Sequence, residues 1–108
     1  MERRLSKLYT RYKLTLAKRY TIPVGSVVEL EVNEVIEIPK SALGTQQRNY
    51  GTFHIRKKHA MKGLFQAVST PFHEGFKGKP TIVVQNSDVT EFELLELEEI
   101  GELWLFDS

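Results

Sequence analysis

Residues 71–86 read PFHEGFKGKPTIVVQN, a turn rich in glycine followed by an apolar run. Gly75, Gly78 and Pro80 mark a tight turn, because glycine adopts backbone conformations that other residues avoid and proline fixes its own. Residues 81–84 are all β-branched, which favours a strand. The stretch therefore predicts a hairpin that leads directly into a strand.

Short segments of the same kind lie on both sides of this hairpin. We predict strands over residues 27–32, 35–38, 51–55, 64–68, 92–97 and 103–106, turns at 23–26 and 86–88, and a polar loop at 41–49. Residues 57–63 are compatible with a short helix that Gly63 ends. Many short strands at this spacing are typical of an all-β barrel or sandwich rather than a βαβ protein.

The first twenty residues differ from the rest in periodicity and in charge. Apolar residues recur there at helical spacing: Leu5, Leu8, Tyr9, Tyr12 and Leu16. This spacing predicts a helix over residues 3–20, with basic residues on its other face. The β-formers Thr10, Tyr12 and Thr15 leave a strand as the alternative. We predict a basic N-terminal segment over residues 1–20 and a β domain over residues 21–108.

Composition places the chain among ordinary globular proteins. Its 108 residues are 41% hydrophobic and 27% charged, which suits one folded domain. A chain this short buries only about two-thirds of its unfolded surface, so oligomerisation would help it. The absence of cysteine excludes disulfides and thiolate sites. The sequence has no apolar run long enough to span a membrane and starts with MERR, so we expect an intracellular, cytoplasmic protein.

Charge is distributed unevenly although the net charge is only +1. Basic residues predominate in residues 1–20, where Glu2 is the single acid, and residues 86–108 carry acids and no Lys or Arg. A second basic cluster occupies residues 56–58. This asymmetry predicts either a site for nucleic acid or nucleotide phosphate, or pairing of the oppositely charged ends within or between subunits.

Residue types that could carry chemistry are few. A zinc site needs three or four converging ligands, and His54, His59, His73 and Glu74 are the only conceivable set, so exposed or locally bonded histidines are the favoured prediction. The sequence has neither a G-x-S-x-G nucleophile motif nor a G-x-x-x-x-G-K-[ST] phosphate loop. The turn at residues 75–79, GFKGK, combines flexible backbone with two lysines, which would suit phosphate as well as a plain hairpin.

Residues 71–80, with the strand that ends at Asn86, resemble the third motif of the dUTPase and dCTP-deaminase family. That motif runs approximately G-x-I-D-x-G-[YW]-x-G, then a strand, then Asn; Gly75, Gly78 and Asn86 match it, and Phe76 supplies the aromatic. Further segments line up in order at residues 22–30, 34–44, 56–60 and 100–106. Arg56 falls at the arginine of the second motif, Arg-Ser-Ser-Leu-Ala, for which Arg48 is a competing match.

The resemblance, which covers roughly residues 20–106, implies a β-clip fold: a distorted, mainly β barrel with one short helix. It also implies a homotrimer whose nucleotide sites form between subunits. In that family the hairpin backbone, here Gly75 and Gly78, reads a pyrimidine, and the aromatic, here Phe76, packs on deoxyribose. The phosphate-binding residues carried over to this chain, together with the lysines of the hairpin, are Arg56, Lys57, Lys58, Lys77 and Lys79.

Several positions depart from the family pattern. His73 stands at the catalytic or sugar-binding Asp, and Val83 at the general-base Glu of the deaminases. Taking a proton from water at neutral pH needs a suitable base, and valine cannot supply one. Lys57 and Lys58 replace the phosphate-binding serines, and Glu102 replaces the Gln of the last strand.

Three functional hypotheses follow. The first is a nucleotide- or phosphate-binding module without the family's catalysis, of a shortened kind that would suit a virus. The second is a divergent nucleotide pyrophosphatase or deaminase that uses His73 with Glu74, with Mg²⁺ expected only for the pyrophosphatase. The third is an assembly module in which basic residues 3–19 dock on acidic strands of a neighbour. The basic N-terminal segment would also suit nucleic acid, and we predict no protein-held metal and no membrane partner.

Overall fold

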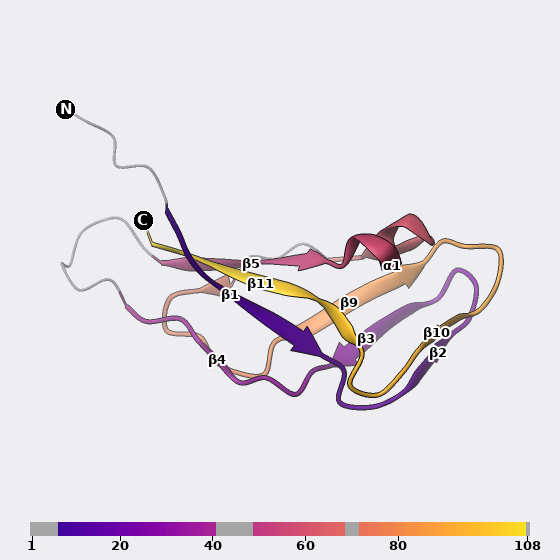
Figure 1. Ribbon diagram of the computed structural model, residues 1–108, viewed down its shortest axis with the longest axis horizontal. Coiled ribbons are helices and arrows are strands. Elements are labelled where there is room, and N and C mark those ends of the chain that lie inside the picture. Colours follow the sequence, from indigo (N-terminus) through magenta and orange to yellow (C-terminus); the bar gives the residue numbers. More distant parts are fainter. Residues whose placement is uncertain (1–6, 41–48, 69–71, 108) are drawn as a thin grey trace.

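The computed structural model describes residues 7–40, 49–68 and 72–107 (Figure 1). Its elements, in chain order, are β1 (Lys7–Thr15), β2 (Tyr20–Ile22), β3 (Val27–Glu31), β4 (Ile36–Glu37), β5 (Tyr50–Ile55), α1 (Lys57–Met61), β6 (Leu64–Gln66), β7 (Phe72–His73), β8 (Lys77–Gly78), β9 (Thr81–Asn86), β10 (Phe92–Leu94) and β11 (Glu99–Asp107). The predicted mainly β fold with one short helix is confirmed. Within the described ranges α1 is too short to cross a membrane, and no other helix could do so.

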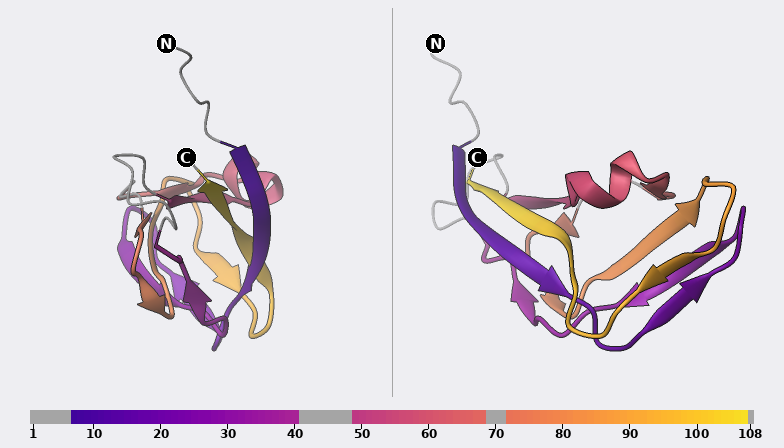
Figure 2. Two further views of the ribbon diagram at one scale, coloured as in Figure 1. Left: turned by 90° about the vertical axis from the view of Figure 1, so that its left-hand side faces the viewer. Right: turned by 45° about the vertical axis from the view of Figure 1, so that its right-hand side comes forward.

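The strands form four small antiparallel sheets. The largest has the order β1-β11-β5-β7, and the second has the order β3-β9-β6. The two remaining sheets are the two-stranded pairs β10–β2 and β4–β8. Figure 2 shows β1 and β11 running side by side at one end, while the β2–β10 ribbon projects at the other.

One apolar core joins these sheets, because each strand turns alternate residues inward. In β9, Ile82, Val84 and Asn86 are buried, whereas Thr81 and Gln85 are exposed. Strands β1 to β6, β10 and β11 also contribute buried apolar residues to the core, for example Leu30, Leu94 and Leu103. The second face of each sheet therefore stays available, and this decides where polar groups gather.

Most predicted strands coincide with observed ones. Residues 27–32, 35–38, 51–55, 64–68, 81–84 and 92–97 contain or overlap β3, β4, β5, β6, β9 and β10, and the predicted strand 103–106 lies within the longer β11. The predicted helix at 57–63 is α1. The turn at 23–26 is closed by a hydrogen bond from Ser26 N to Pro23 O of 3.1 Å. The loop predicted at 41–49 lies almost wholly outside the described residues.

The helix predicted over residues 3–20 is wrong for the part of it that the structure describes, where the alternative strand is correct. β1 pairs with β11 from Lys7 to Thr15, with bulges near both ends. Of the apolar residues at helical spacing, Leu8 and Tyr12 are 37% and 39% exposed. The fully buried pair is Leu14 and Leu16, two residues apart, which is the period of a strand. Pairing with a nine-residue partner thus outweighed local periodicity.

Candidate functional site

The turn between β7 and β8 needs its two glycines. Gly75 has a φ of 86° and Gly78 a φ of 144°, and both lie in a region that other L-residues rarely adopt. Hydrogen bonds dock the turn on the segment after β4: Gly75 N donates to Ile38 O at 2.8 Å, and Ile38 N donates to Phe76 O at 2.9 Å. The hairpin is therefore held by backbone contacts at its tip.

Phe76 is fixed on the inner side of this hairpin. It is half-buried against the core, and its ring meets that of Phe72 edge to face, with centroids 5.1 Å apart. His73 is exposed and lies opposite Tyr50 in the β5–β7 pair. The Glu74 carboxylate accepts a hydrogen bond of 3.4 Å from Asn49 N, so it contacts the entry to β5.

A second feature lies where β5 ends. Side chains from β1, β5, β11 and the start of α1 surround a hollow of about 340 Å³, which we call the β5-end hollow. Its charged and aromatic lining residues are Lys13, His54, Arg56, Lys57, Glu99, Glu102 and Trp104. Arg56 Nε lies 3.5 Å from Glu99 Oε2, so one of the three cations is already partly paired.

Strand register explains how the hollow is assembled. Lys13, Glu102 and His54 stand in one row across β1, β11 and β5 and share the outward face of the sheet. Arg56 follows in extended backbone and its N–H donates to Ile100 O at 2.9 Å, which fixes the start of α1 beside β11. Segments far apart in sequence thus meet at one point.

His54 adds an aromatic wall rather than a charge. Its ring stacks on Trp104 with centroids 3.8 Å apart, and its Nε2 lies 2.8 Å from Thr52 Oγ1. Burial lowers the pKa of His54, an effect that Glu102 partly offsets and Arg11 reinforces. His54 is therefore neutral at pH 7, and the positive charge of the hollow comes from Lys13, Arg56 and Lys57.

The hairpin and the hollow lie at opposite ends of β5. His73 is opposite Tyr50 at the start of that strand, whereas Arg56 directly follows its end. A strand rises about 3.3 Å per residue, so the two places are roughly 17 Å apart along it. The structure brings Arg56 and Lys57 together, and keeps Lys77 and Lys79 near the hairpin. Lys58 is exposed on α1.

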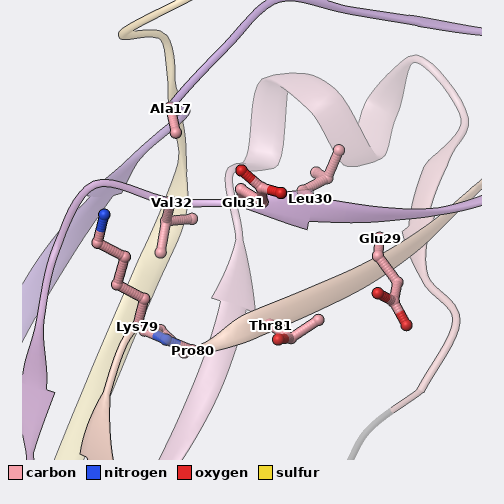
Figure 3. Close-up of a pocket in the computed structure, with 8 residues that line it drawn as sticks. All are labelled: Ala17, Glu29, Leu30, Glu31, Val32, Lys79, Pro80 and Thr81. Atoms are coloured by element: carbon pink, nitrogen blue, oxygen red, sulfur yellow. The ribbon is translucent and has the colours of Figure 1, made fainter.

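Lys79 borders a different hollow, of about 280 Å³, at the start of β9. Figure 3 shows its side chain beside Pro80 and Thr81, with Glu29 and Glu31 on the neighbouring strand β3. The lining of this hollow includes two carboxylates and one ammonium group, so the hollow does not favour an anion. Val83, at the position of the deaminase carboxylate, is half-buried on β9 opposite Glu29.

Asn86, which matches the last residue of the family's third motif, is a structural residue in this fold. Its side chain is fully buried and donates to Ile22 O at 3.0 Å and Thr90 O at 2.9 Å. Its side-chain oxygen Oδ1 accepts a hydrogen bond from Asp88 N at 2.9 Å. The residue thus holds the β9–β10 turn against β2.

Sequence reasoning missed Lys13, Trp104 and the place of His54. Alternation of Arg11 and Lys13 would have indicated Lys13, had the N-terminal segment been interpreted as a strand, but no local signal marks Trp104 or His54. It also missed the buried contact of 2.6 Å between His59 Nε2 and Glu98 Oε2. In the described ranges no three His, Asp or Glu side chains gather closely enough to hold a metal ion.

Some basic residues near the beginning of the chain lie beside acidic residues near its end in the same subunit. Arg19 Nη2 lies 3.1 Å from Glu93 Oε1, which joins the basic beginning to the acidic end. Lys13 faces Glu102 across the β1–β11 pair. Pairing of oppositely charged ends therefore occurs within the subunit, although Lys13 and Lys57 remain exposed at the hollow.

No family model and no curated protein sequence matches the chain. Solved structures do match: the dUTPase of EIAV has a TM-score of 0.70 at 18% identity, over 90% of this chain and 74% of that one. A Staphylococcus bacteriophage 80alpha dUTPase mutant with dUpNHpp gives 0.73 at 14%, over 97% and 74%. A mutant dUTPase of phage phi11 of S. aureus, described with a structural Mg(II) ion, gives 0.72 at 11%, over 88% and 74%. The chain has a dUTPase-like fold, as its motifs predicted.

Proposed function

We propose that this protein binds a phosphate-bearing pyrimidine deoxynucleotide at the β5-end hollow and lacks the catalysis of dUTPases and dCTP deaminases. The observation that carries the proposal is the convergence of Lys13, Arg56 and Lys57 on one hollow of a dUTPase-like fold. Charge-assisted hydrogen bonds from such groups to phosphate are stronger than neutral ones. Lys57 stands where the family motif has a phosphate-binding serine, so it adds one more positive charge at the hollow.

The base and sugar would be bound by the β7–β8 hairpin of a second copy. Phe76 offers a ring already fixed by Phe72, and the glycine turn offers close approach to the backbone. Because hairpin and hollow of one chain lie roughly 17 Å apart along β5, one nucleotide cannot fill both places in the same subunit. A homotrimer with sites between subunits, as the family resemblance implies, would bring them together.

Two positions support the absence of catalysis. His73 replaces the family's Asp and is exposed to solvent, and Val83 replaces the deaminase Glu. Neither supplies a carboxylate that could activate water beside the nucleotide. Glu99 and Glu102 are the carboxylates at the hollow. In the part of the chain that the structure describes, they belong to no group of three His, Asp or Glu residues that could hold a metal ion. Any Mg²⁺ would therefore be held mainly by the nucleotide's own phosphates.

The test combines thermal stabilisation with turnover. The protein is incubated with dUTP, dCTP or dUMP, with and without Mg²⁺, and both melting temperature and product are measured. A ligand that binds only the folded state stabilises it by about 2.7 kcal/mol at roughly one hundred times its Kd, so the melting temperature should rise with ligand concentration. We expect this rise without product.

Variants locate the site. Lys57→Ala should weaken binding about tenfold, because it removes one charged contact to phosphate. Lys18→Ala is the matched control: the same charge is lost, but Lys18 lies beside Glu31 and outside the hollow. Equal binding by Lys57→Ala and the parent would contradict the proposed site.

Product formation would instead favour the divergent enzyme. In that case His73→Ala should abolish turnover while the oligomer stays intact. An unshifted melting temperature with every nucleotide would contradict nucleotide binding itself and leave the assembly hypothesis.

A further inference from the structure

The outer face of the β1-β11-β5 sheet carries an ordered set of rings and cations that extends beyond the hollow, although Lys13, His54 and Trp104 also line it. Register places the side chains in three rows: Lys13–Glu102–His54, Arg11–Trp104–Thr52 and Leu8–Phe106–Tyr50. Rows are two residues apart along β11 and β5, or about 6.8 Å, whereas the bulge in β1 adds one residue between Arg11 and Leu8. His73 extends the last row on β7. This outer sheet face thus runs from the β5-end hollow to the hairpin.

The rings of this face form two parallel pairs. His54 and Trp104 are stacked with centroids 3.8 Å apart and an interplanar angle of 27°. Tyr50 and Phe106 are stacked at 5.1 Å and 13°. All four side chains are half-buried, so part of each stays accessible to solvent. Such pairs stabilise neighbouring strands, and a flat ligand would pack on the ring faces and edges that the pairs themselves leave uncovered.

Cations accompany the rings. The Arg11 guanidinium lies 4.5 Å from the centre of the Trp104 ring and is exposed. Lys13 is exposed in the next row, and Arg56 and Lys57 follow at the hollow. Among the residues that line the hollow, Glu99 and Glu102 are the acids that oppose them. A face with stacked rings flanked by exposed cations is complementary to a ligand that has both bases and phosphates.

We propose that the outer sheet face binds single-stranded nucleic acid, with one phosphate in the β5-end hollow and the following bases along the two ring pairs. The inference rests on the proposed function in that the hollow is the phosphate site. Rings and arginine planes accept any unpaired base, so the binding is tolerant of sequence. A duplex would not bind in this way, because its bases are already stacked on each other and cannot contact the rings of the protein.

Trp104 makes the inference directly measurable, since it is the only tryptophan of the chain. Its fluorescence is followed while dUMP or oligothymidylates of increasing length are added at low salt. We expect quenching, and an affinity for an oligonucleotide of about six residues at least about tenfold above that for dUMP, because each stacked base adds to binding. The affinity should fall as salt rises, since bound phosphates release counterions.

Substitutions separate the sheet face from the hollow. Tyr50→Leu and Arg11→Gln should each weaken oligonucleotide binding about fivefold or more and leave dUMP binding unchanged. Lys57→Ala should weaken both ligands, and Lys18→Ala neither. Melting curves of each variant show whether it is folded.

The outcomes distinguish the two proposals. Oligonucleotides that bind no better than dUMP would overturn the sheet-face inference and leave the nucleotide site standing. Oligonucleotide binding that Tyr50→Leu weakens, without any binding of dUMP, would support the sheet face and overturn the nucleotide site. A Trp104 signal that ignores oligonucleotides but changes with protein concentration would overturn the inference, because a second copy would then cover this face.

Discussion

The hairpin and the β5-end hollow are built on opposite principles. The hairpin is local: Gly75 and Phe76 lie within a few residues, and its geometry depends on backbone conformation and hydrogen bonds. The hollow is assembled from β1, β5 and β11, so residues nearly ninety positions apart supply its wall, as Lys13 and Glu102 do. One feature can therefore fail without the other, and substitutions at each end should have separable effects.

The largest effect is expected at Gly101, where the hollow meets the core. A Cβ at this position would overlap the carbonyl oxygen of His54 and lie 2.8 Å from the Phe53 ring. Because the first obstacle is backbone of the paired strand, Gly101→Ala should destabilise the fold by about 3 kcal/mol or more. Urea unfolding measures this; a loss below about 1 kcal/mol would show that β5 and β11 can separate at little cost.

The next effect is expected at His59, which joins α1 to the turn before β11. Its buried ring lies 2.6 Å from the Glu98 carboxylate and 6.0 Å from the centre of the Phe92 ring. His59→Ala removes both contacts and leaves a cavity, so we expect a loss of about 2 kcal/mol. Nucleotide affinity should fall as well, because α1 carries Lys57 to the hollow.

Glu98→Gln is the matched variant for this contact, since it keeps a hydrogen-bonding side chain of the same size. We expect it to cost less than His59→Ala in the same unfolding experiment. A variant as unstable as His59→Ala would show that the carboxylate charge, rather than packing, holds α1 in place.

Gly75→Ala at the hairpin should have a smaller effect than Gly101→Ala. A Cβ there meets only Lys40 Cε at 3.8 Å, so space is available and the cost comes from the φ of 86°. Left-handed backbone costs a residue with a Cβ about 1–2 kcal/mol. Phosphate binding at the hollow should be unchanged, whereas pyrimidine recognition should weaken; loss of inorganic phosphate binding would contradict the independence of the two ends.

This contrast also explains what the sequence could predict. The glycine turn and the β-branched run of residues 81–84 depend on local chemistry, so their structure followed from the residues themselves. The matched order of motifs predicted the dUTPase-like fold, which the solved structures confirm. Arg56 was predicted for phosphate from its motif, and its role in binding stays a prediction.

The rest depended on register. Lys13 and His54 share a row only because β1 and β5 flank β11, and nothing local marks that arrangement. The predicted helix at residues 3–20 hid the alternation that aims Arg11 and Lys13 outward. Trp104 attracted no attention in sequence because its importance comes from its neighbours across the sheet, Arg11 and His54.

The smallest expected effect is a pH dependence of stability that arises from His54 at the hollow. Burial lowers the pKa of His54, so below its unfolded value of about 6.5 the unfolded chain binds the proton more readily than the folded chain. The stability that neutral His54 contributes is therefore fully present above pH 6.5 and is lost as the pH falls toward the lower folded pKa.

His54→Phe keeps a ring against Trp104 and removes the titration. Its stability should fall less than that of the parent between pH 7.5 and 5, in paired urea unfolding curves. The other two histidines are common to both proteins and cancel in this comparison. Equal pH dependence would mean that folding leaves the pKa of His54 unchanged.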